Sequence, residues 1–255
     1  MAELIFLGTG AANYKLEEKD ADFRRNSSVL IDKKLLIDPG PHIFDYIESF
    51  GCEDLFDKLE TILITHSHGD HFSPESVYRL AENRKITIAC DGHKKEILGN
   101  HKNIEYTELN PYKDYSINGY TITPILANHL IVSQGNHHAF HFIIKDSHGK
   151  TLFYGLDGSW FLKPSWMRMC EEKYDIMVLE VTVGEINDGR IFEHNSIPMC
   201  RDMVQQIRSK NLLASDGRII ASHLAKGLIP PHKEAEKIFG SFGVETAYDS
   251  MKIIY

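Results

Sequence analysis

Four potential metal ligands lie within six residues of one another: His66, His68, Asp70 and His71, in the segment THSHGDH. The apolar residues 61–64 before them are short enough for a strand, and residues 74–76 after them are typical of a helix start. Histidines two apart on an extended chain point the same way and can bind one ion, whereas the side chains beyond the bend can face a second. Two ions about 3.5–4 Å apart can generate hydroxide at neutral pH and assist a hydrolysis. The segment therefore predicts a two-metal hydrolytic site on one strand-to-helix loop.

The alternative is a solvated polar loop with no metal. Four ligand-type side chains in six residues are hard to explain by packing or solubility alone. The chain also holds 14 histidines, several of them in dense local clusters, and histidine is the commonest metal ligand. The composition thus favours the metal site.

The spacing of apolar residues predicts sheet and helix in alternation. We expect strands at 3–7, 28–32, 34–37, 61–65, 85–90, 104–109, 120–126, 139–145, 151–154, 175–181, 218–222 and 245–255, and helices at 41–50, 196–209 and 231–240. Two stretches of sheet of similar weight, each accompanied by helices, predict an α/β fold, namely a four-layer α/β/β/α sandwich. No linker or repeat marks a boundary, so we expect a single domain over residues 1–255.

The net charge and the composition restrict the kinds of substrate and partner that the chain can bind. The net charge of −8 gives the wrong long-range field for long nucleic acid, which favours a small-molecule substrate. No basic leader or membrane-length apolar run occurs, so we expect a cytoplasmic protein with no membrane contact. The four cysteines form no C-x-x-C pair and are read as free thiols. The sequence is compatible with a homodimer of this chain.

The motif H-x-H-x-D-H after a strand resembles the signature of the metallo-β-lactamase superfamily, and further motifs follow in that family's order. Residues 4–10 (LIFLGTG), 35–40 (LLIDPG), 127–129 (ANH), 152–157 (LFYGLD) and 220–223 (IASH) carry the resemblance. It implies one ion on His66, His68 and His129 and a second on Asp70, His71 and His223. It also implies that Asp157 bridges the two ions and that Asp38 orients the metal loop from behind. Taken singly, His129 and His223 would more often be ordinary histidines.

Aspartate rather than cysteine at the bridging position resembles the phosphodiesterase-like branch of the superfamily. The segments RRNSS at 24–28 and YDSM at 248–251 are similar to tRNase Z and phosphoribosyl cyclic phosphodiesterase. Two features depart from those relatives: residues 11–23 contain no cysteine for an extra metal, and no long basic insert is present to grasp tRNA. The resemblance implies cleavage of a phosphodiester, and the departures count against tRNA.

The segment FEHNS at 192–196 resembles the one that supplies a catalytic histidine in tRNase Z, which implies that His194 protonates the leaving oxygen. The alternative is a histidine near a helix start with no chemical role. Asp70 and His194 are the candidate catalytic residues.

Two other clusters contain residue types found in functional sites. His137, His138 and His141 have a spacing that fits a polar strand edge better than a metal site. The aromatic residues that follow Asp157 fit a substrate pocket and core packing equally well: Trp160, Phe161 and Trp166.

The sequence thus predicts a dinuclear hydrolase that cleaves a small or cyclic phosphodiester through a metal-bridging hydroxide. Zinc suits the histidine-rich ligands, and the aspartates would also accept manganese or iron. One alternative is a hydrolase of a carboxylic substrate such as a lactone, thioester or amide. The other is a metal-binding protein without turnover.

Overall fold

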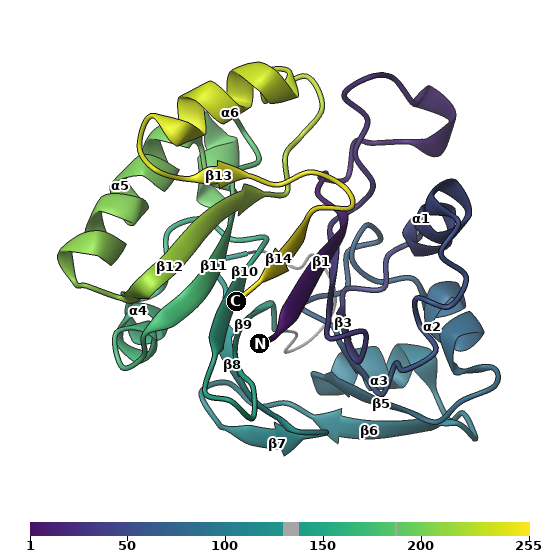
Figure 1. Cartoon of the computed structure of the whole chain (residues 1–255). Helices are drawn as coiled ribbons and strands as arrows, with labels where there is room; N and C mark the ends of the chain where they lie inside the picture. The colour runs from purple at the N-terminus through teal and green to yellow at the C-terminus, as the bar shows by residue number, and fades with distance from the viewer. Residues whose placement is uncertain (130–137, 187) are drawn as a thin grey trace.

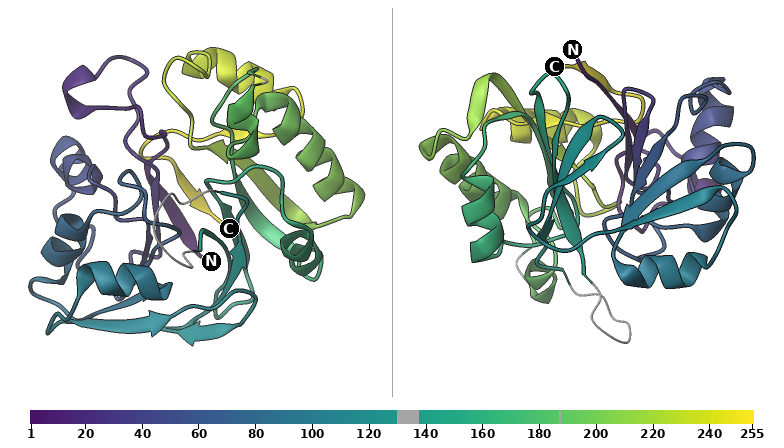
Figure 2. Two further views of the ribbon diagram at one scale, coloured as in Figure 1. Left: turned by 180° about the vertical axis from the view of Figure 1, so that it is seen from behind. Right: turned by 90° about the horizontal axis from the view of Figure 1, so that it is seen from below.

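The computed structural model describes residues 1–129, 138–186 and 188–255. Its strands form two seven-stranded sheets that pack face to face, and helices cover the outer face of each sheet (Figures 1 and 2). This arrangement confirms the predicted four-layer α/β/β/α sandwich.

The first sheet has the strand order β14-β1-β2-β3-β4-β5-β6 and is antiparallel from β14 to β3 and parallel from β3 to β6. Its strands are β1 (Glu3–Gly8), β2 (Ser28–Ile31), β3 (Leu35–Ile37), β4 (Thr61–Leu63), β5 (Ile86–Cys90), β6 (Ile104–Glu108) and β14 (Lys252–Ile254). The helices on this side are α1 (Ile43–Phe50), α2 (Pro74–Ala81) and α3 (Gly92–Leu98).

The second sheet has the order β13-β12-β11-β10-β9-β8-β7 and is parallel from β10 to β13. Its strands are β7 (Tyr115–Ile117), β8 (Tyr120–Leu126), β9 (Phe140–Lys145), β10 (Thr151–Gly155), β11 (Tyr174–Glu180), β12 (Leu213–Ser222) and β13 (Glu245–Thr246). Its helices are α4 (Lys163–Met169), α5 (Ile197–Ser209) and α6 (His232–Gly240), and two short 3₁₀ segments are η1 (Leu16–Glu18) and η2 (Gly189–Phe192).

Both faces of the central strands are buried. On β1, Leu4 and Phe6 belong to the core between the two sheets, whereas Ile5 and Leu7 belong to the core between the first sheet and its helices. A third core lies between the second sheet and its helices. Burial on both faces explains why these strands are continuous apolar runs rather than alternating patterns.

The predicted single strand at 245–255 is wrong. The segment divides into β13, which joins the second sheet, and β14, which joins the first. Between them Ser250 has a left-handed backbone (φ 73°), and Asp249 accepts hydrogen bonds from Thr9 Oγ1 at 2.9 Å and the Arg25 backbone N–H at 2.8 Å. These contacts turn the chain from one sheet to the other.

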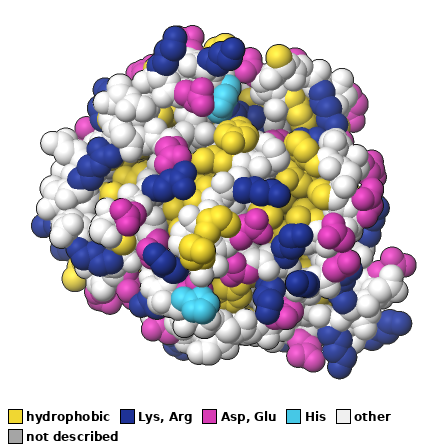
Figure 3. All heavy atoms as spheres, in the orientation of Figure 1, with side chains coloured by type: hydrophobic (Ala, Val, Ile, Leu, Met, Phe, Trp, Pro, Cys, Tyr) yellow, Lys and Arg dark blue, Asp and Glu magenta, His cyan; other side chains and the backbone are white. Residues whose placement is uncertain are grey.

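The surface mixes charges of both signs. On the face shown in Figure 3, Lys and Arg side chains are interspersed with Asp and Glu, and hydrophobic side chains show between them. Among the described residues, no helix combines the length and the apolar character needed to cross a membrane.

Candidate metal centre

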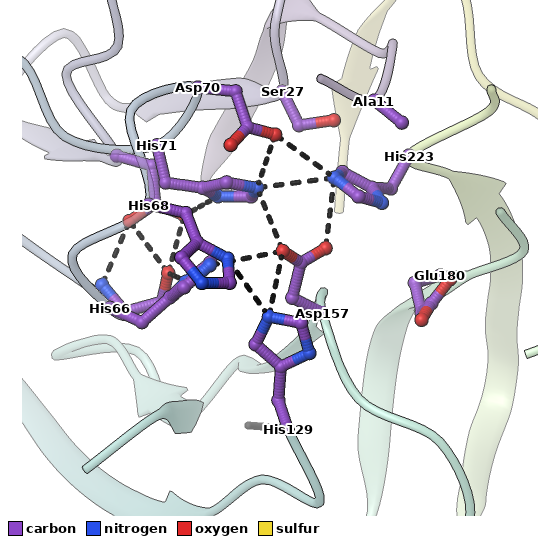
Figure 4. Close-up of polar contacts among 12 residues, drawn as sticks. Ala11, Ser27, His66, His68, Asp70, His71, His129, Asp157, Glu180 and His223 are labelled. Atoms are coloured by element: carbon purple, nitrogen blue, oxygen red, sulfur yellow. Dashed lines mark hydrogen bonds and ion pairs between the residues drawn. The ribbon is translucent and has the colours of Figure 1, made fainter. Parts of the chain in front are cut away.

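The seven predicted ligands meet at one edge of the sandwich (Figure 4). The loop after β4 carries four of them, and the ends of β8, β10 and β12 carry one each: His66, His68, Asp70, His71, His129, Asp157 and His223. The carboxyl ends of parallel strands meet at one edge of a sheet, which brings residues distant in sequence together. The structure therefore places all seven residues in one site.

Among the described residues, four groups of side chains are placed so that each could hold a metal ion, and two of these groups consist of predicted ligands alone. The other two include His194, with His129 and Glu193 or with Glu180 and His223. In the first group of predicted ligands, the ligand atoms within 4.8 Å of one another come from His66, His68, His129 and Asp157. In the second, they come from Asp70, His71, Asp157 and His223. Asp157 belongs to both groups of predicted ligands, and this is the division that the family resemblance implied.

Backbone bends direct three of the site residues inward. Asp38, Asp157 and His223 each follow a strand and have positive φ angles of 59°, 53° and 56°. A left-handed backbone is uncommon for residues other than glycine and carries strain that surrounding contacts must overcome. The strain is located at the candidate site.

Asp38 fixes two of the imidazole rings from behind. His71 Nδ1–H donates to Asp38 Oδ2 at 2.8 Å, and the Thr65 hydroxyl donates to the same oxygen, also at 2.8 Å. Thr65 Oγ1 in turn lies 2.9 Å from His66 Nδ1. With Nδ1 of each ring engaged, the Nε2 lone pairs of His66 and His71 face the centre of the site. This is the orienting contact predicted for Asp38.

His129 and His223 are held in the same way. His129 Nδ1 lies 3.3 Å from the Glu193 carbonyl oxygen, and His223 Nδ1 lies 2.8 Å from Thr182 Oγ1. Metal-binding histidines usually donate their second N–H to such an acceptor, which fixes the tautomer. His68 instead presents Nδ1, 3.1 Å from His129 Nε2.

The nitrogen and oxygen atoms that face the centre fit divalent cations. His71 Nε2 and His223 Nε2 lie 3.1 Å apart, so two nitrogens whose second positions are already engaged face each other. The buried His66 Nε2 lies 3.0 Å from Asp157 Oδ2, and His223 Nε2 lies 2.8 Å from Asp157 Oδ1, so nitrogen and carboxylate atoms converge at the centre of the site. Imidazole nitrogens and carboxylate oxygens are ligands of zinc and related ions, so these residues fit two divalent metals.

The charges of the site are strongly coupled. Burial would raise the pKa of the Asp157 carboxyl, but the neighbouring His223 and His71 outweigh burial and lower it well below its usual range. Burial would likewise lower the pKa of His71, but the Asp157 and Asp70 carboxylates raise it well above its usual range. Protons and metal ions would therefore compete for the same ligand atoms.

His194 lies beside this cluster and contacts a residue that the sequence reasoning missed. Its Nδ1 is 3.0 Å from Oε1 of Glu180, which is fully buried at the end of β11. Thr182 Oγ1 donates to the other carboxylate oxygen, so Glu180 contacts the His194 ring directly and His223 through Thr182. A charged residue ending the apolar run IMVLE was the available signal for Glu180.

A cavity of about 470 Å³ opens onto the cluster. Asp70, Asp157, His194 and His223 line it on the metal side, and Arg190 from η2 also contributes to its wall. Its volume is within the range of small-molecule sites.

The other histidine cluster differs from its prediction. His141 is buried rather than at a polar edge, with its Nε2 3.3 Å from the Asp157 carbonyl oxygen. The backbone N–H of His138 donates to Asp91, and His137 lies outside the described residues. The position of His141 at the core end of β9 explains the difference, because both faces of that strand are covered.

The aromatic residues after Asp157 divide between core and surface. Phe161 and Trp166 stack with ring centroids 6.1 Å apart and pack against the core between the second sheet and its helices. Trp160 is 45% exposed and is not among the residues that line the cavity. For Phe161 and Trp166, the structure therefore supports core packing rather than a place in a substrate pocket.

The family comparison agrees with the fold. The model of the beta-lactamase superfamily domain matches residues 33–209, which is more than half of the chain. The chain therefore belongs to the β-lactamase superfamily, and its fold is that of the metallo-β-lactamase proteins. No curated protein matches the sequence.

Solved structures share the fold at low sequence identity. The metallo-β-lactamase fold protein YhfI from Bacillus subtilis is 17% identical, with a TM-score of 0.75 over 99% of this chain and 98% of that one. Zn²⁺-bound PqqB from Methylobacterium extorquens is 14% identical, with a TM-score of 0.74 over 99% and 100%. The short form of human tRNase Z is 18% identical, with a TM-score of 0.70 over 99% and 98%.

The buried His141 predicts a loss of stability in acid. Burial lowers the pKa of this imidazole from 6.5 to about 4, so its contribution is present above pH 6.5 and is lost as the pH falls through about 4. Between pH 7 and pH 4, the metal-free wild type should lose about 3 kcal/mol more unfolding free energy than His141→Phe. Urea denaturation across this range measures the difference, and parallel pH profiles would contradict the prediction.

Proposed function

We propose that the chain is a dinuclear metal-dependent phosphodiesterase that acts on a small or cyclic phosphodiester. The observation that carries the proposal is the pair of ligand groups that share Asp157 beside a cavity that also contains His194. Two divalent ions bound there would supply a nucleophilic water at neutral pH and stabilise the charge that develops on the phosphoryl oxygens. The likeness to tRNase Z supports phosphodiester chemistry, because a ribonuclease cleaves phosphodiesters.

The proposed ligands are those that the family resemblance implied. His66, His68 and His129 would hold one ion, Asp70, His71 and His223 the other, and Asp157 both. Five imidazoles among seven ligands favour zinc, and the solved PqqB structure contains Zn²⁺. Manganese or iron would also suit the carboxylates.

His194 is the proposed general acid. Burial would lower its pKa, but the Glu180 carboxylate outweighs burial and raises it, which favours the protonated ring that a general acid needs. With Nδ1 bound to Glu180, Nε2 is the nitrogen left to donate a proton to the departing oxygen. Glu180 thereby sets both the orientation and the protonation of the ring.

The cavity supports a small substrate. Its volume of about 470 Å³ suits a ligand of metabolite size, and Arg190, which is paired with Asp188 at 2.6 Å, lies on its wall. The net charge of −8 is unfavourable for long nucleic acid. We therefore expect a compact substrate with one or two anionic groups.

Loss of the shared carboxylate tests the proposal. Asp157→Ala should reduce hydrolysis of bis-p-nitrophenyl phosphate to background, because both ions lose a ligand. Asp202→Ala removes an exposed carboxylate from α5 with the same change of charge and should leave the rate unchanged. Wild-type turnover of a lactone or thioester panel without any phosphodiester cleavage would contradict the proposal and favour a carboxylic substrate.

The leaving group tests His194. p-Nitrophenolate departs without protonation, whereas the alkoxide of a ribose cyclic phosphate needs a proton. His194→Gln should therefore slow cleavage of the cyclic phosphate by roughly 10²–10⁴-fold and affect the nitrophenyl ester much less. His148→Gln, in an exposed turn, is the matched control. Equal losses on the two substrates would exclude His194 as the acid.

A further inference from the structure

The backbone turn at Asp157 controls both halves of the proposed metal centre. Asp157 is the one side chain common to the two ligand groups. Its φ of 53° places it in a region that L-residues rarely adopt, and glycine, not aspartate, would occupy it without strain. A strained turn persists only when neighbouring contacts hold it.

On one side, the turn is held by residues near the candidate acid. The Gly158 N–H donates to Glu180 Oε1 at 3.3 Å, and the Gly158 carbonyl accepts from Asn195 Nδ2 at 2.9 Å. On the other side, the Asp157 carbonyl oxygen accepts from His141 Nε2 at 3.3 Å. His141 is thus the side chain that contacts the backbone carbonyl of the shared ligand itself.

His141 and the turn fit together closely. The His141 ring meets Phe153 and Phe161 edge to face, each at a centroid distance of 5.8 Å, which fixes its plane. A Cβ atom at position 158 would lie 2.8 Å from His141 Nε2, closer than side chains pack, so only glycine allows this approach. The imidazole therefore sits directly against the turn.

The hydrogen bond, rather than packing, explains an imidazole at this position. His141 is 1% exposed, and its Nδ1 has no hydrogen-bond partner among the described residues. An apolar ring would fill the space between Phe153 and Phe161 without burying an unsatisfied nitrogen. What an apolar ring could not supply is the N–H that Nε2 directs to the Asp157 carbonyl.

We propose that His141 is a positioning residue that holds the Asp157 turn, so that the Asp157 carboxylate remains between the two groups of ligands. The inference rests on the proposed dinuclear centre and assigns a role to a side chain outside the ligand set. Because Asp157 is shared, loss of the His141 contact should weaken both ions rather than one.

Cobalt binding to metal-free protein tests the inference without any assay of activity. Co²⁺ titration against a competing chelator, followed by visible absorption, gives the stoichiometry and both affinities. His141→Phe keeps a buried ring and removes the donor, and it should weaken both binding steps by roughly 10–100-fold. His141→Gln can place an amide N–H near the position of Nε2 and should remain within a few-fold of wild type.

The Co²⁺ affinities of the His141 variants distinguish a positioning role of this side chain from a packing role. If His141→Phe does not fold, as judged by circular dichroism, His141→Asn replaces it, because its shorter amide reaches the position of Nδ1 but not of Nε2. Wild-type affinities in the variant that lacks the donor, or equal losses in that variant and in His141→Gln, would overturn the inference alone. Fewer than two Co²⁺ ions in the wild type would overturn the proposed centre and the inference with it.

Discussion

The buried Asp157 carboxylate is the interaction on which this edge of the structure depends. Its oxygens lie 3.0 Å from His66, 2.8 Å from His223, 3.3 Å from His71 and 3.6 Å from His129, so it contacts ligands carried by both sheets. A buried carboxylate is costly unless it is paired, and here every nearby partner is an imidazole that can also bind a metal. An unpaired carboxylate would destabilise an ordinary core. Here the contacts of the Asp157 carboxylate with imidazoles connect the two sheets.

The hydrogen bonds around the cluster mainly orient the imidazole rings, so that their free nitrogens face the centre of the site. Asp38 and Thr65 orient two rings from the first sheet, and Thr182 orients His223 from the second. Such contacts behind the ligands are as much a part of a metal site as the ligands themselves. Glu180 extends the arrangement to His194, so the candidate acid and the candidate ligand His223 share one network of hydrogen bonds.

The sandwich and the loop at 66–71 could be predicted from the sequence because both depend on local signals, whereas His129, Asp157 and His223 were placed in the site only through the family resemblance. Buried strands appear as apolar runs, and four of the ligands are adjacent in one loop. Short elements such as β7, α3 and α4 were missed, because three to seven residues carry little periodicity. The break at Ser250 depends on contacts with distant Thr9 and Arg25. The contacts of Glu180 with His194 and of His141 with Asp157 join residues 14 and 16 positions apart, beyond the reach of a helical or strand periodicity.

We propose that two ions bind on either side of the Asp157 carboxylate, and anomalous X-ray diffraction from zinc-reconstituted crystals would locate them. We expect two anomalous peaks. One should lie among His66, His68 and His129, the other among Asp70, His71 and His223, with Asp157 contacting both. A single peak, or peaks away from Asp157, would contradict the proposal.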